Sequence, residues 1–153
     1  MTGIGVAEDA ITVALAQQRV EAGKVGANVD RAVAAIERAA ENGAELVCLP
    51  ELFNVGYFAF EAYERNAEGL DGQTLDRIGD AAAEHGVAVQ AGSIVENLAA
   101  SAAAGFSTPE PEGLANASVF LDRSGEVEAV YRKQHLFGYD SAETQLLTPV
   151  ESL

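Results

Sequence analysis

Residues 28–50 read NVDRAVAAIERAAENGAELVCLP, and the spacing of their apolar side chains predicts a helix followed by a strand. Apolar residues recur three and four positions apart over 29–40, as on one face of a helix, until an Asn-Gly pair ends the pattern. Asn28 stands before them and has the side chain of a helix N-cap. The short apolar run 45–49 then predicts a buried strand, which Pro50 terminates.

A similar apolar run precedes the helix at 11–16 and predicts a first strand that is buried on both faces of a sheet. Strand, helix and strand form a β-α-β unit, which favours an α/β fold. Farther along, the pattern predicts a short irregular helix over 58–68, a longer helix over 73–84 and a third strand over 87–95. Gly92 inside that strand indicates a bulge or a close approach of backbone.

The last third of the sequence is less regular. Residues 97–114 hold alanine repeats, serines, glycines and two prolines, and we expect a surface loop there within the same domain. Residues 117–121 and 127–131 flank the four-residue turn 122–125, which ends in glycine and predicts an antiparallel hairpin. Residues 132–153 are expected to be irregular.

The length of 153 residues with 48% hydrophobic residues suffices for one core, so we expect a single domain over 1–153. The longest apolar run is far shorter than the roughly 20 residues that span a bilayer, and no basic segment precedes it. Neither a transmembrane helix nor a signal peptide is therefore expected, and the protein should be cytoplasmic. One cysteine and two distant histidines predict no disulfide, metal or other cofactor.

The net charge of −15, from 24 acidic and 9 basic residues, disfavours nucleic acid and anionic membranes as partners. Seven of the basic residues are arginine and only two, Lys24 and Lys133, are lysine. This composition resembles that of proteins from salt-loving archaea, where salt screens the repulsion between like charges. The alternative is an ordinary acidic protein.

Glu51 follows a predicted buried strand and Pro50, at the edge of the sheet where α/β proteins place their active sites. A carboxylate there would be partly desolvated and could act as a general base. The alternative is a solvated loop glutamate.

Lys133 stands at the end of a predicted strand in a chain that holds little lysine. A buried ammonium there could stabilise an oxyanion, whereas the alternative is a surface lysine with its head group in water. Glu143 lies in an acidic stretch where spacing alone indicates a solvated side chain. Cys48 alternates within an apolar strand and is expected to be a buried, unreactive thiol.

Three segments resemble the nitrilase superfamily of carbon-nitrogen hydrolases. They are residues 14–17, residues 46–53 with Gly56-Tyr57, and residues 131–137, which read YRKQHLF. The third is the most specific and resembles the omega-amidase and N-carbamoyl-amide hydrolase branch. Residues 143–149 resemble the segment that supplies a second glutamate in this family, although Val150 stands where the family usually has glycine.

The resemblance implies an α-β-β-α sandwich of the nitrilase type, of which residues 1–153 would form the N-terminal half, and assembly into a dimer or larger homo-oligomer. It implies that Glu51 is the general base, Lys133 the cation that stabilises the oxyanion, and Glu143 a second, positioning glutamate. The implied substrate is a small amide, carbamoyl compound or nitrile, and the motifs fit all three.

The nucleophilic cysteine of this family lies beyond the second glutamate, and residues 1–153 contain no such segment. We therefore expect a truncated hydrolase that is inactive without its C-terminal half. Two other functions fit the same residues. One is a non-catalytic binding or assembly module of the same fold that pairs with a full-length homologue, and the other is an α/β domain of unrelated function.

Overall fold

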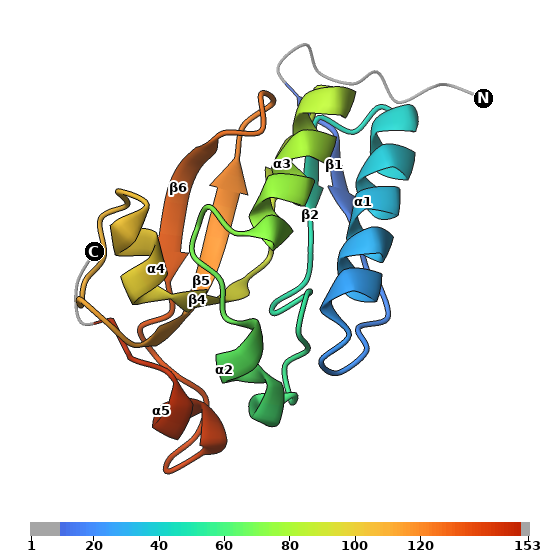
Figure 1. The fold of residues 1–153 in the computed structure, drawn as a ribbon. Coiled ribbons are helices and arrows are strands. Elements are labelled where there is room, and N and C mark those ends of the chain that lie inside the picture. The colour runs from blue at the N-terminus through green and yellow to red at the C-terminus, as the bar shows by residue number, and fades with distance from the viewer. Residues whose placement is uncertain (1–9, 151–153) are drawn as a thin grey trace.

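The computed structural model describes residues 10–150, in which helices pack against one mixed β-sheet (Figure 1). The strands of this sheet are Val13–Leu15 (β1), Leu46–Cys48 (β2), Ala88–Gln90 (β3), Ile94–Asn97 (β4), Leu114–Leu121 (β5) and Val127–Arg132 (β6). The helices are Val25–Glu41 (α1), Tyr63–Asn66 (α2), Gln73–His85 (α3), Leu98–Ala103 (α4) and Ala142–Leu146 (α5), with a 3-10 turn at Phe60–Ala62 (η1). Within residues 10–150, no helix is both long and apolar enough to cross a membrane.

The sheet has a parallel part and an antiparallel part. β1, β2 and β3 are parallel neighbours, as the predicted β-α-β unit requires. β5 pairs with β6 along one edge, and along its other edge it pairs first with β4 and then with β3, in each case antiparallel. The predicted hairpin is thus confirmed as β5 and β6, and Gly125 in its turn has a positive φ of 84°.

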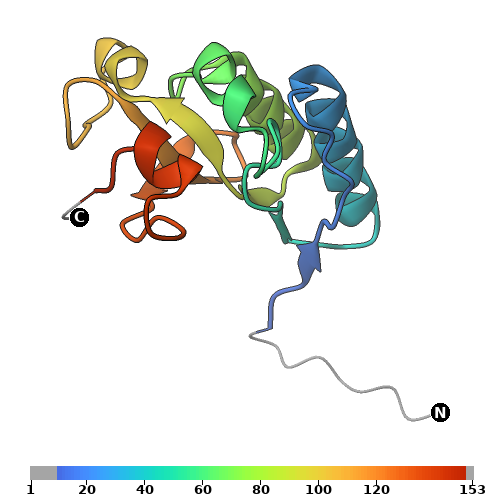
Figure 2. The same cartoon turned by 90° about the horizontal axis from the view of Figure 1, so that it is seen from below.

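Helices α1 and α3 lie side by side over one face of the sheet (Figures 1 and 2). Their apolar side chains form the core with the sheet residues that point toward them, among them Val47, Val89 and Val119, which are fully buried. At one end of the opposite face, Val95 and Leu114 pack with Leu146 and Leu147 of the α5 region, and we call the rest of this face the open face. Its side chains include those of Val13, Leu15, Cys48, Gln90, Ser118, Phe120 and Tyr131.

Two predictions about the first half of the chain are wrong in part. Helix α1 begins at Val25, with Lys24 at its N-cap, so Asn28 lies inside the first turn and its side chain does not cap the helix. This side chain accepts the N–H of Glu21 and donates to the carbonyl groups of Glu21 and Asn54, so it holds two loops against the helix.

Strand β1 is shorter than the predicted 11–16 and lies at the edge of the sheet. Leu15 is 80% exposed and Val13 45% exposed, so burial on both faces is contradicted. Cys48, predicted to be buried, is only half-buried because its side chain points to the open face. Its apolar neighbours in the sequence, Val47 and Leu49, are buried and belong to the core.

The predicted strand 87–95 is two strands, β3 and β4, separated at Gly92. Gly92 has a φ of +51°, and a Cβ atom there would lie 1.9 Å from the carbonyl oxygen of Pro50. The predicted close approach of backbone at Gly92 is therefore confirmed. The two strands occupy successive parts of the same edge of β5 because the chain bends at this glycine.

The predicted helices over 58–68 and 73–84 are confirmed as η1 with α2 and as α3. Two segments expected to lack secondary structure contain short helices. Within 97–114, the Asn97 side chain accepts the N–H of Ala100 and caps α4. Within 132–150, the Ser141 hydroxyl accepts the N–H of Thr144 and caps α5. Residues 151–153 lie outside the described part of the chain.

Candidate active site

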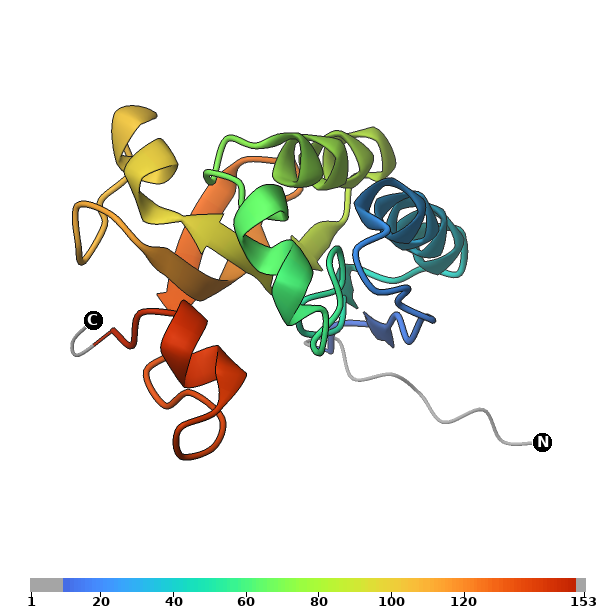
Figure 3. The same ribbon diagram turned by 60° about the horizontal axis from the view of Figure 1, so that its bottom comes forward.

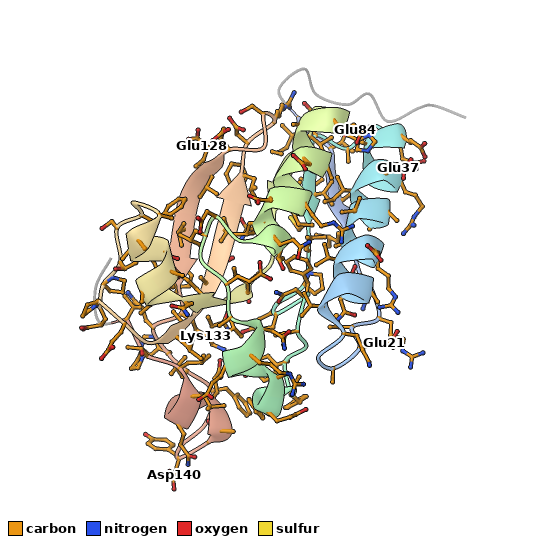
Figure 4. All side chains as sticks on the ribbon, in the orientation of Figure 1. Glu21, Glu37, Glu84, Glu128, Lys133 and Asp140 are labelled. Carbon is orange, nitrogen blue, oxygen red and sulfur yellow. The ribbon has the colours of Figure 1, made fainter. Side chains whose placement is uncertain are left out.

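The three candidate residues Glu51, Lys133 and Glu143 meet at one end of the sheet. Glu51 follows β2, Lys133 follows β6, and Glu143 lies on α5, which packs against η1 below the strand ends (Figure 3). The Lys133 Nζ atom lies 3.1 Å from Oε1 of Glu51 and 3.1 Å from Oε1 of Glu143. In Figure 4 Lys133 lies within the outline of the molecule, whereas the labelled Glu37, Glu84 and Glu128 lie at its periphery.

The backbone around Glu51 is fixed on both sides by the bend between β3 and β4. Before Glu51, the Pro50 carbonyl packs onto Gly92, where no side chain could fit. After it, Leu52 has a φ of +47° and donates its N–H to the Ser93 hydroxyl at 3.0 Å. A left-handed leucine costs energy, so this conformation depends on the contacts that hold it. The contacts of Gly92 and Ser93 therefore fix the backbone position from which the Glu51 side chain extends.

The Glu51 side chain is 46% exposed, so the expected desolvation of this carboxylate is not observed within residues 10–150. Its Oε1 atom accepts hydrogen bonds from Lys133 and, at 2.8 Å, from Nδ2 of Asn116. No hydrogen bond from residues 10–150 reaches Oε2. One oxygen of Glu51 is thus held and the other faces solvent.

Glu143 is almost fully buried, with 1% exposure, and is not the solvated residue that its acidic stretch indicates. Its Oε2 accepts the Phe137 N–H at 2.7 Å and the Tyr57 hydroxyl at 3.0 Å, while Oε1 accepts from Lys133. Burial raises the pKa of Glu143, but these three donors outweigh burial, and the pKa lies below the usual range. Glu143 therefore stays ionised and fully hydrogen-bonded.

The Lys133 side chain is 24% exposed. Its backbone position is fixed, because its main-chain N–H donates to the Asn116 carbonyl at 2.9 Å. Burial lowers the pKa of Lys133, but hydrogen bonds and charges from Glu51 and Glu143 outweigh burial and raise it. The ammonium lies 5.5 Å from the centre of the Tyr57 ring, close enough for a cation–π contact. Burial and the Glu143 carboxylate raise the pKa of Tyr57, so its hydroxyl remains a donor.

The residue before Lys133 has a structural partner. Arg132 forms two hydrogen bonds, of 2.7 and 2.8 Å, to the carboxylate of the fully buried Glu96 on β4. These two side chains cross β5 beside Ala115 and Ala117, on the face opposite to Lys133. The ion pair ties β4 to β6 and so fixes the end of the strand that carries Lys133.

The open face is hollowed beside Glu51 and Lys133, with a volume of about 430 Å³. The hollow is large enough for a small organic molecule. Its lining consists of Leu49, Glu51, Gln90, Gly92, Ser93, Asn116, Ser118, Tyr131 and Lys133. A free carboxylate oxygen and an ammonium at the edge of such a hollow can move a proton and stabilise a developing negative charge.

Cys48, the single cysteine of the chain, does not line this hollow. In the part of the chain that the structure describes, no group of three or more His, Cys, Asp or Glu side chains is arranged to hold a metal ion. The structure also adds two residues that the sequence analysis did not assign a role, Asn116 and Tyr57. Asn116 could have been noticed as a polar residue inside the apolar run 114–121, and Tyr57 as part of a quoted motif.

Comparison with known proteins identifies relatives along most of the chain. The model of the family described as carbon-nitrogen hydrolase matches residues 12–152. A nitrilase homologue from Dictyostelium discoideum is 33% identical over 131 residues, which are 82% of this chain and 37% of that protein. An omega-amidase from Homo sapiens is 32% identical over 131 residues, 82% of this chain and 43% of that protein.

Solved structures match the fold over nearly all of the chain. An amidase of the nitrilase superfamily from Nesterenkonia superposes with a TM-score of 0.77 and 26% identity, covering 98% of this chain and 52% of the amidase. A nitrilase-superfamily member from Saccharomyces cerevisiae superposes with a TM-score of 0.75 and 25% identity, covering 93% and 49%. The chain thus spans about half the length of these structures and less than half of the curated relatives.

Proposed function

The chain belongs to the carbon-nitrogen hydrolase family, and from this premise we propose that it supplies the general base and the oxyanion-stabilising cation of an enzyme that hydrolyses small non-peptide amides, carbamoyl compounds or nitriles. The observation that carries the proposal is the position of the Lys133 ammonium, 3.1 Å from both Glu51 and Glu143 beside an open hollow.

The two carboxylates have different surroundings, and the difference supports different roles. Glu143 is buried, and both of its oxygens already accept hydrogen bonds, so it is suited to hold Lys133 in place. Glu51 is half exposed and keeps one oxygen free of donors from residues 10–150. A base must reach the proton that it removes, and only Glu51 offers an accessible oxygen at the hollow.

In the proposed reaction, the nucleophile is a thiol from outside residues 1–153. Glu51 takes the thiol proton, and the thiolate sulfur attacks the substrate carbon. For an amide, the carbonyl electron pair moves onto oxygen, and the third N–H of Lys133 donates to this oxyanion while the other two stay on the carboxylates. Glu51 returns its proton to the leaving amine, and the C–N bond breaks. Glu51 then takes a proton from water as the water oxygen attacks the thioester carbon. The C–S bond breaks, Glu51 returns the proton to the departing thiolate, and the acid is released.

Two observations support a thiol from elsewhere. Cys48 lies on the open face outside the lining of the hollow and cannot meet Glu51 as a nucleophile without leaving β2. In a structural relative, a glutamate-to-glutamine mutant of the Nesterenkonia amidase, acrylamide has added to the active-site cysteine, and that chain is about twice as long as this one. The open face, with Leu15 and Tyr131 exposed, offers the surface against which the thiol-bearing half would pack.

The proposal is tested by joining the C-terminal half of a relative after Leu153 and measuring ammonia release from butyramide. We expect no turnover by residues 1–153 alone, turnover by the joined protein, and a loss of at least about a hundredfold with Glu51→Gln or Lys133→Ala. Glu45→Gln is the matched control, because Glu45 also pairs with a cation, Arg123, but lies outside the site. A folded joined protein without turnover, or turnover by residues 1–153 alone, would contradict the proposal.

A further inference from the structure

Glu51 and Lys133 reach the site from strands that are not neighbours. Glu51 follows β2 and Lys133 follows β6, and β3 and β5 lie between them in the sheet. Small relative movements of the two strands would therefore change the contact between carboxylate and ammonium. A base and a cation that act together must be held in position relative to each other to within a few tenths of an ångström.

Asn116 contacts both residues. Its Nδ2 atom donates to Oε1 of Glu51 at 2.8 Å, and its main-chain carbonyl accepts the N–H of Lys133 at 2.9 Å. Asn116 is 3% exposed and lies on β5, where it is in register with Val95 of β4. Its backbone is therefore held by strands on both sides, and Asn116 can fix the position of Glu51 relative to Lys133.

The hydrogen bond from Asn116 also selects one oxygen of Glu51. Oε1 accepts both from Asn116 and from Lys133, so its lone pairs are engaged. Rotation of the carboxylate by half a turn would exchange the oxygens, and rotation to any other angle would break one or both of these bonds. The other oxygen, Oε2, is thereby left as the one that can accept a proton.

We propose that Asn116 is a positioning residue, which fixes Glu51 against Lys133 and leaves one carboxylate oxygen free as the base. This inference rests on the proposed role of Glu51. An amide suits the position, because it donates to the carboxylate without adding a charge. An aspartate of the same shape would instead place a second negative charge against Oε1, and an alanine would leave the carboxylate held by Lys133 alone.

The contact is tested first in residues 1–153, without any need for activity. The side-chain amide signals of Asn116 in a ¹⁵N–¹H spectrum, assigned by their loss in Asn116→Asp, should shift when Glu51 is replaced by glutamine. They should not shift in Glu45→Gln, which changes a carboxylate outside the site. Asn116 signals that are the same in Glu51→Gln and in the unsubstituted chain would overturn the proposal.

The consequence is tested in the joined protein with butyramide. We expect Asn116→Ala to lower kcat about 10- to 100-fold while KM changes less than about threefold, because the substrate still binds but the base is misplaced. Asn116→Asp should lose at least as much. Ser101→Ala is the matched control, because it removes a buried hydrogen bond, to the N–H of Leu70, away from the site. It should lower the melting temperature and leave kcat unchanged.

A kcat of Asn116→Ala within about threefold of the unsubstituted joined protein would overturn the positioning role. An inactive joined protein would instead contradict the proposed function, and the amide spectrum would still decide whether Asn116 holds Glu51. The two failures are thus distinguishable.

Discussion

Replacing Lys133 with methionine removes the cation that contacts both Glu51 and Glu143. Methionine keeps an unbranched side chain of similar length, so the change is mainly one of charge. The exposed Glu51 can take water in place of Lys133, but Glu143 cannot, because only 1% of its side chain is exposed. Glu143 retains the hydrogen bonds from Tyr57 and Phe137 and loses its counter-charge.

Removing one partner of a fully buried ion pair costs about 3–5 kcal/mol of stability. Lys133 is 24% exposed, so solvent screens part of its interaction, and Glu143 keeps two donors. We therefore expect Lys133→Met to lower the free energy of unfolding by about 1–3 kcal/mol near neutral pH.

The pH dependence of this loss follows from the pKa of Glu143, which is lowered in the folded protein. In the unsubstituted chain, the stability due to Glu143 is present above the unfolded glutamate pKa of about 4.3 and is lost as the pH falls through the lower folded pKa. In Lys133→Met, the buried Glu143 carboxylate has no counter-charge. Acid that protonates Glu143 removes this buried, unpaired charge. The difference between the two proteins should therefore shrink toward about pH 4.

Urea unfolding followed by circular dichroism measures this difference at both pH values. Lys24→Met is the matched control, because Lys24 is the other lysine, is exposed, and takes part in none of the ion pairs observed in residues 10–150. A loss below about 0.5 kcal/mol near pH 7, or a loss equal at the two pH values, would refute the buried pairing of Lys133 with Glu143.

Three further predictions concern the rest of the chain. With a net charge of −15, the melting temperature should rise from low to molar KCl as repulsion is screened, and a flat or falling trend would remove the expectation of adaptation to high salt. Gly92→Ala should lower the free energy of unfolding by about 2–5 kcal/mol, because its Cβ would lie 1.9 Å from the Pro50 oxygen. Gly43→Ala is the control, with a φ of +81° and open space, and should lower it by about 1 kcal/mol. Equal losses in urea unfolding would contradict the clash. Cys48 should react with a thiol reagent in residues 1–153 and become protected in the joined protein, and equal labelling rates would mean that the open face stays uncovered.

The sequence predicted the parts of this fold that depend on local pattern. The helical spacing over 29–40 and the apolar run before Pro50 were sufficient for α1 and β2, and the glycine-ended turn was sufficient for the β5–β6 hairpin. The predicted burial of strand β1 failed because apolar composition does not reveal which strand lies at the edge of a sheet.

Long-range hydrogen bonds account for the other differences. Asn28 resembles an N-cap in sequence, but its amide is used by Glu21 and Asn54, which no local rule reveals. Glu143 was placed in the site by resemblance only, and one of the donors that hold its carboxylate is Tyr57, 86 positions away in the sequence. Asn116 was missed because its role depends on Glu51, 65 positions before it.

We propose Glu51 as the base that activates a thiol at this site. Mass spectrometry of the joined protein, quenched within one turnover of butyramide, measures this directly as an acyl group bound to the cysteine. We expect the acylated protein to form in the unsubstituted joined protein and to form at least about a hundredfold more slowly in Glu51→Gln. Acylation of Glu51→Gln at the unsubstituted rate would contradict the claim.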